Sequence, residues 1–167
     1  MCSWYGIVCD VETNTVIGTQ LPRVNLSGTL SAEISILSDL RFIDLSENHI
    51  IGDIPLEIKQ LPNLRGINLA HNDLHGTLQG FHPSLSILNV SHNELDGTLT
   101  RDFGEEASYL EVLDASFNKM SGFLPPSLGK MSTLKVLDLG HNQFNGTIPP
   151  SVGQLKELKE LFLNDNR

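Results

Sequence analysis

Three histidines and several carboxylates recur at intervals that would bring them together in a coiled chain. His71 and His92 are 21 residues apart in the sequence. If each coil adds one strand to a sheet, they would lie on neighbouring strands, about 5 Å apart. Imidazoles at that distance, with acids nearby, can bind a metal ion or form a pH-sensitive contact. Surface histidines in a polar column are more often solvated, and we favour that interpretation.

The common catalytic motifs are absent from the sequence. It contains no G-x-S-x-G, no H-E-x-x-H, no Walker loop, no kinase glycine-rich loop and no calcium-binding loop. The acid pairs fall on solvated positions or on positions set by the repeat described below. No pocket is implied that would shift their pKa values. We therefore predict that the chain is not an enzyme and has no catalytic residues, no metal and no cofactor.

The elements that would position these side chains are successive copies of one repeat. Seven segments begin at Val16, Leu40, Leu64, Leu85, Leu110, Leu134 and Leu158. Four of the six complete segments are 24 residues long, the third is 21 and the fourth is 25. The second reads LRFIDLSENHIIGDIPLEIKQLPN and follows the pattern L-x-x-L-x-L-x-x-N-x-L-x-G-x-I-P. A repeat of this period across a whole chain predicts a solenoid.

The residue types at each position of the repeat indicate how the turns would stack. Alternating polarity at positions 4 to 6 is typical of a strand with one buried face. One turn cannot bury its apolar side alone, so neighbouring turns must cover it. Position 9 is asparagine in six turns, at Asn48, Asn72, Asn93, Asn118, Asn142 and Asn166. An unpaired buried amide costs about 1–3 kcal/mol, so we expect this asparagine ladder to bond backbone groups of adjacent turns.

These features resemble the plant-type leucine-rich repeats, whose signature includes the L-x-G-x-I-P element found at Ile50–Pro55 and Phe144–Pro149. The resemblance covers essentially the whole chain. It implies an α/β solenoid, a right-handed superhelix with a parallel concave β-sheet. The convex side would carry short 3₁₀-helical, helical and extended segments.

The opening CSWYGIVC is similar to the end of the N-terminal cap of plant receptor kinases, receptor-like proteins and polygalacturonase-inhibiting proteins. By that resemblance, Cys2 and Cys9 form a disulfide and Trp4 packs over the first turn. The alternative is a pair of free thiols in a reducing compartment. We expect residues 1–15 to end the cap and residues 16–167 to form seven repeats, the last incomplete. We also expect the chain to be a fragment, or an incomplete gene model.

Residues that the repeat does not dictate are the candidates for binding. Positions 3, 5, 7 and 8 of each turn point away from the core and would form the concave face. Our candidate ligand contacts there are Phe42, Asp44, Glu47, Asn68, His71, His92, Asp114, Phe117, Asp138, His141 and Phe162. The three phenylalanines read as isolated aromatics on a polar, acidic surface, and such aromatics can anchor a ligand. Aspartate at position 5 is common in this repeat, so the acidic column alone is weak evidence.

Composition limits the class of partner. The net charge of −9 disfavours binding to nucleic acid or anionic membranes and suits a basic or neutral partner. Plain solubility explains the acidity equally well. Acceptor sequons at Asn25, Asn89 and Asn145 are candidates for glycosylation, although chance would supply some of them.

Three functions remain open. We favour an extracellular recognition module, the ligand-binding ectodomain segment of a cell-surface leucine-rich-repeat receptor. Its partners would be a protein or peptide ligand and a co-receptor, with no nucleic acid and no membrane contact of its own. The alternatives are a secreted soluble protein, such as an inhibitor of a cell-wall enzyme or an extracellular structural protein, and an intracellular scaffold. The sequence opens without a signal peptide, so any export signal would lie upstream.

Overall fold

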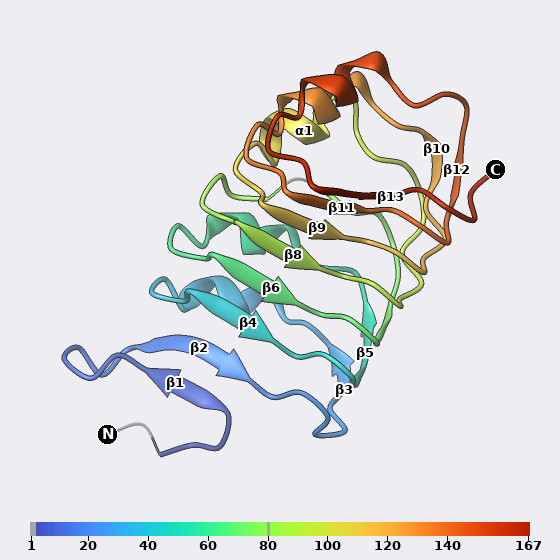
Figure 1. Cartoon of the computed structure of the whole chain (residues 1–167). Coiled ribbons are helices and arrows are strands. Elements are labelled where there is room, and N and C mark those ends of the chain that lie inside the picture. Colours follow the sequence, from blue (N-terminus) through green and yellow to red (C-terminus); the bar gives the residue numbers. More distant parts are fainter. Residues whose placement is uncertain (1–2, 80) are drawn as a thin grey trace.

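Each turn of the repeat contributes one strand to a single curved sheet. The computed structural model describes residues 3–79 and 81–167, and Figure 1 shows the strands stacked in chain order. Within these residues the sheet contains β1 (Ile7–Cys9), β2 (Val16–Gln20), β4 (Phe42–Asp44), β6 (Gly66–Asn68), β8 (Ile87–Asn89), β9 (Val112–Asp114), β11 (Val136–Asp138) and β13 (Glu160–Phe162). β1 is antiparallel to β2, and the other neighbouring pairs are parallel. The predicted parallel sheet of a solenoid is confirmed.

After each strand the chain bends into a shorter extended flank and then closes over the back of the coil. The flank contains one parallel sheet of β3 (Ser27–Thr29), β5 (His49–Gly52) and β7 (Asp73–Leu74), and another of β10 (Ser121–Phe123) and β12 (Gln143–Asn145). The back consists of the 3₁₀-helices η1 (Ala32–Ile36), η2 (Leu56–Gln60), η3 (Pro126–Lys130) and η4 (Pro150–Gln154), with one short α-helix, α1 (Phe103–Glu106). None of the helices among the described residues has the length and apolar character needed to cross a membrane.

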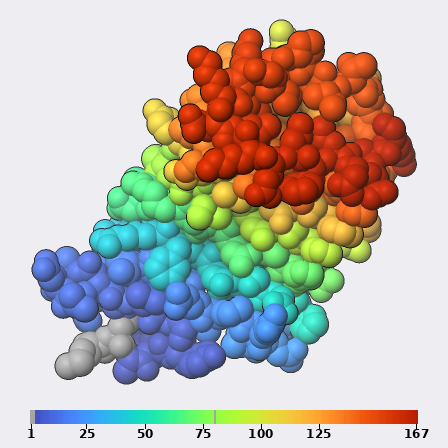
Figure 2. All heavy atoms as spheres, viewed as in Figure 1, coloured from blue at the N-terminus to red at the C-terminus, as the bar shows by residue number. Residues whose placement is uncertain are grey.

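Aliphatic side chains fill the space between the sheet and the back. The position-4 residues Ile43, Ile67, Leu88, Leu113 and Leu137 are at most 1% exposed. Each such burial contributes about 1.5–3 kcal/mol. Figure 2 shows the atoms of successive turns as consecutive bands of colour, so each turn packs against the turns beside it. The core therefore depends on the register between neighbouring turns.

The asparagine ladder forms as predicted. Asn48, Asn72, Asn93, Asn118 and Asn142 are at most 9% exposed, and the amide of Asn166 is partly buried. In each of these turns the amide nitrogen donates to backbone carbonyls of its own turn and of the preceding turn. The amide oxygen accepts an N–H from the preceding turn, as Asn93 does from Leu74 at 3.0 Å. The ladder starts at the second turn, where the oxygen of Asn48 accepts the N–H groups of Val24 and Leu26 from the first.

The two irregular turns differ at the back of the coil. The short turn has no 3₁₀-helix among its described residues, and the ring of Phe81, 7% exposed, fills the core instead. The long turn forms α1, with Phe103 fully buried. The N–H of Gly104 donates to Ser127 Oγ at 3.1 Å, and a Cβ at Gly104 would lie 1.9 Å from the Ser127 carbonyl oxygen. The length changes are thus absorbed at the back, and the strands keep their register.

The N-terminal end differs from the cap that the resemblance implies. Trp4 is 73% exposed, so the prediction that it packs over the first turn is wrong. The backbone carbonyl of Trp4 accepts the N–H of Ile7 at 3.2 Å in the turn before β1, and the Trp4 side chain faces solvent. The end of the solenoid is instead extended by the antiparallel pairing of β1 with β2. Cys2 lies outside the described residues, so the Cys2–Cys9 disulfide stays a prediction.

Candidate ligand-binding site

The residue at position 8 of each turn has left-handed backbone geometry, and in the last six turns it directly precedes the ladder asparagine. Its φ lies between 52° and 56° in seven successive turns, at Arg23, Glu47, His71, His92, Phe117, His141 and Asp165. A non-glycine residue in this conformation costs about 1–2 kcal/mol. Hydrogen bonds between turns hold it there: the Phe117 N–H donates to the Gly140 carbonyl at 3.0 Å, and the Phe117 carbonyl accepts the Asn93 N–H at 3.2 Å. The seven side chains therefore form a single column just beyond the C-terminal ends of the sheet's strands.

Four rings stack face to face in the middle of this column. The ring centroids are 4.1 Å apart between His71 and His92, 4.2 Å between His92 and Phe117, and 4.0 Å between Phe117 and His141. The interplanar angles are 10° to 16°. We call His71, His92, Phe117 and His141 the ring column. Phe117 remains 43% exposed although rings stack on both of its faces, so the column presents ring edges to solvent.

Charged residues extend the column at both ends. At the first end, Arg23 donates from Nε and Nη2 to the two carboxylate oxygens of Glu47, at 2.6 and 2.5 Å. These hydrogen bonds from Arg23 hold the pKa of Glu47 below its usual value, and nearby His71 lowers it further. At the other end, His141 Nε2 lies 3.3 Å from Asp165 Oδ2. The ring column therefore connects two ionic ends.

The centre of the ring column disfavours positive charge. Burial lowers the pKa of His92, and the neighbouring His71 and His141 lower it further, while Asp114 opposes them. A charged imidazolium would lose hydration and meet a second histidine ring face to face. The pKa of His92 therefore lies below that of a histidine fully surrounded by water.

The acidic and amide residues at position 5 have a structural role. A side-chain oxygen of each accepts the backbone N–H two residues later, in Asp44, Asn68, Asn89, Asp114 and Asp138. This bond ends each strand with a tight turn before the left-handed residue. Burial raises the pKa of Asp138, with a contribution from Asp114, and the hydrogen bond from Gly140 opposes the shift. The position-5 column thus borders the ring column with groups already fixed in place.

The remaining candidates are less closely connected to the ring column. Phe42 lies across Gly18, where a Cβ would come within 2.1 Å of the end of its ring, and it is half-buried there. Phe162 is 42% exposed on β13. The interpretation of Phe117 as an isolated aromatic is wrong, because His92 and His141 stack on its two faces. Ring-bearing residues at position 8 of four successive turns were the signal in the sequence for this stack.

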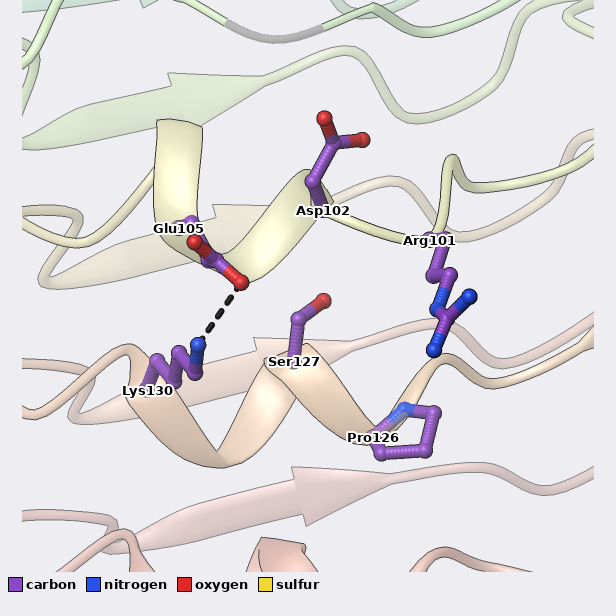
Figure 3. A pocket seen from close by; sticks show the side chains of 6 residues that line it. All are labelled: Arg101, Asp102, Glu105, Pro126, Ser127 and Lys130. Carbon is purple, nitrogen blue, oxygen red and sulfur yellow. Dashed lines mark hydrogen bonds and ion pairs between the residues drawn. The ribbon is translucent and has the colours of Figure 1, made fainter.

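A separate hollow lies at the back of the coil, between α1 and η3. Its volume is about 420 Å³, and it is lined by Arg101, Asp102, Glu105, Pro126, Ser127 and Lys130. Figure 3 shows Glu105 and Lys130 pointing toward one another, and their charged atoms are 2.7 Å apart. Asp102 points away from η3 in the same view. Because the cations and anions there are evenly matched, the hollow presents no net charge to a ligand.

Curated plant proteins are similar in sequence to about a third of this chain. The chain is 46% identical over 54 residues to Protein MALE DISCOVERER 1 of Arabidopsis thaliana, a match that covers 32% of this chain and 8% of that protein. It is 41% identical over 54 residues to the receptor-like kinase RGI5 of the same plant, covering 32% of this chain and 5% of that protein. The chain therefore spans less than a tenth of the length of these curated relatives.

Solved structures match the chain over nearly its whole length. The Arabidopsis receptor kinase HAESA, in complex with the peptide hormone IDA and the co-receptor SERK1, superposes with a TM-score of 0.90 at 34% identity, covering 98% of this chain and 28% of that one. Pollen Receptor Kinase 3 superposes with a TM-score of 0.86 at 30% identity, covering 99% of this chain and 80% of that one. The Leucine Rich Repeat family model matches residues 39–61, 84–105, 109–131 and 133–155. The chain belongs to the leucine-rich-repeat family, with repeats of the plant receptor type.

Proposed function

We propose that this chain is a ligand-binding segment of an extracellular plant-type receptor, and that an extended peptide lies along the ring column. The observation that carries the proposal is the stack itself. Four rings held face to face by left-handed backbone positions form a rigid surface, with Phe117 43% exposed at its centre. Exposed aromatic groups that are already fixed bind with little loss of conformational entropy. HAESA, to which the chain is similar, is a peptide-hormone receptor with a co-receptor, which supports the same class of partner.

The charges around the ring column favour particular groups on the ligand. Asp114 interacts electrostatically with His92, and Asp138 with His141, so carboxylates border the rings on the sheet side. The net charge of the chain is −9. A basic side chain can therefore pair with these carboxylates while apolar groups of the peptide pack against the exposed edges of the rings. The segment acts by binding alone, without catalysis, at the cell surface.

A peptide-display library, selected against the chain, tests this proposal. Phe117→Ala removes the central ring and should weaken binding of selected peptides by about 10-fold or more, as expected for an anchor residue. Tyr109→Ala is the matched control, because Tyr109 is 60% exposed and precedes the same strand that Phe117 follows. Equal losses in the two variants, or no loss in Phe117→Ala, would place the binding surface elsewhere.

A further inference from the structure

An exposed aromatic residue faces a glycosylation sequon on the flank of the solenoid. β10 and β12 pair in parallel, with Phe123 directly opposite Asn145. Side chains of paired residues point to the same side of a sheet, about 5 Å apart. The Phe123 ring extends over Gly146, the middle residue of the sequon, where a Cβ would lie 2.5 Å from Phe123 Cδ1. Phe123 nevertheless remains 72% exposed, so most of its side chain faces solvent.

The sequon at Asn145 is also accessible to solvent. Asn145, Gly146 and Thr147 are all exposed. The other two sequons differ from it. Asn89 is half-buried on the concave sheet, its oxygen accepts from the N–H and the hydroxyl of Ser91, and Ser91 is 5% exposed. Asn25 is exposed with φ of 59°, but it precedes β3 and has no strand partner among the described residues. Only the Asn145 sequon, of the three, has an aromatic ring in register with its asparagine.

We propose that Asn145 carries an N-linked oligosaccharide whose first sugar, an N-acetylhexosamine, packs on the exposed face of Phe123. The donor is a lipid-linked diphosphate oligosaccharide of the secretory pathway, so this step rests on the proposed extracellular function. Asn145 Nδ2 attacks C1 of the donor sugar, the C1–O bond to the diphosphate breaks, Nδ2 loses one proton, and the lipid diphosphate leaves with the bonding electrons. The C–H groups on one face of the attached sugar then cover the ring, as apolar groups cover aromatic faces elsewhere.

The chain, secreted from a eukaryotic cell line behind a heterologous secretion signal, tests both parts of the proposal. Mass spectrometry of the tryptic peptide from Val136 to Lys156 should show a glycan on Asn145. Thermal unfolding of Asn145→Gln should then give a Tm about 2–4 °C below that of the glycosylated chain. Trimming the glycan to its first sugar should leave the Tm unchanged, because only that sugar contacts Phe123.

A double-mutant cycle isolates the contact with the ring. In the Phe123→Ala background, Asn145→Gln should change the Tm by less than half as much, and Phe123→Tyr should restore the full effect. Phe123 is exposed, so both substitutions leave the core intact. Glycan on Asn25 with none on Asn145 would overturn the proposal, as would equal Tm shifts with and without the ring. Either result is independent of peptide binding at Phe117, so this test and that of the proposed function fail separately.

Discussion

Asn93→Ala should destabilise the chain by removing a bridge between two turns. The Asn93 amide donates to the carbonyl oxygens of Leu69 (3.0 Å), Val90 (3.0 Å) and Ser91 (3.1 Å). All three oxygens keep a second donor after the substitution: the amides of Asn72 and Asn118 and the N–H of His71. The N–H of the fully buried Leu74 loses its acceptor, Asn93 Oδ1.

These contacts set the size of the effect. Leaving one buried N–H unpaired costs about 1–3 kcal/mol, and each shared hydrogen bond that is lost costs less because its acceptor remains paired. We expect the free energy of unfolding to fall by about 2–4 kcal/mol, measured by urea denaturation with far-UV circular dichroism. Asn63→Ala is the control, because the Asn63 amide is exposed and makes one bond, to the Ser38 carbonyl of the preceding turn at 3.2 Å. It should change stability by about 0.5 kcal/mol or less.

A second substitution at the same position separates the donor from the acceptor. Asn93→Asp keeps an oxygen for the Leu74 N–H but turns a carboxylate toward the carbonyls that the amide contacted. Repulsion between these oxygens should make it at least as destabilising as Asn93→Ala at neutral pH. If Asn93→Ala were no more harmful than Asn63→Ala, or if Asn93→Asp restored stability, the ladder would not hold the turns together as described.

Two further predictions concern the back of the coil and the ring column. Gly104→Ala should lower the free energy of unfolding by about 1–3 kcal/mol, because the new Cβ meets the Ser127 backbone at 1.9 Å. Gly153→Ala is the control, since no atom lies within 4 Å of the added Cβ. Equal effects of the two substitutions on urea unfolding would contradict the close packing of Gly104 against Ser127. The pKa of His92 is lower in the folded chain than in the unfolded chain, so the unfolded chain binds the proton more tightly. Protonation therefore favours unfolding, and the free energy of unfolding should fall as pH drops below about 6.5. His92→Gln should remove this pH dependence from the free energy of unfolding, measured by urea denaturation at successive pH values. An unchanged pH dependence would count against a neutral His92 within the stack.

The repeat pattern predicts most of the fold because its periods are those of packing. Apolar residues at fixed positions fill the core, and an asparagine that must be buried can only bond backbone groups, as Asn93 does. The role of the residue at position 5 is ambiguous in the sequence. Asp114 has the same sequence position whether it binds a ligand or ends a strand, and only the bond from the Ser116 N–H to its carboxylate reveals the second role.

The ring column and the exposed tryptophan depend on features that the pattern does not contain. Phe117 and its histidine neighbours differ in residue type, so their stacking follows from side-chain orientation at left-handed positions. The backbone preferences of phenylalanine disfavour that geometry, because a positive φ is rare for bulky residues. The packing of Trp4 follows only from the resemblance to a cap, and its contacts depend on the local turn before β1, which the resemblance does not specify.

Histidine NMR signals test the central claim most directly, because the six histidines divide into two groups. Three are in the ring column, at His71, His92 and His141, and three lie elsewhere: His49 and His75 near aspartates on the flank, and His82 bonded to Ser84 at the back. Addition of a peptide selected from the display library should shift the ring-proton signals of the first group and leave those of the second unchanged. Shifts confined to His49, His75 or His82 would show that the ligand binds away from the ring column.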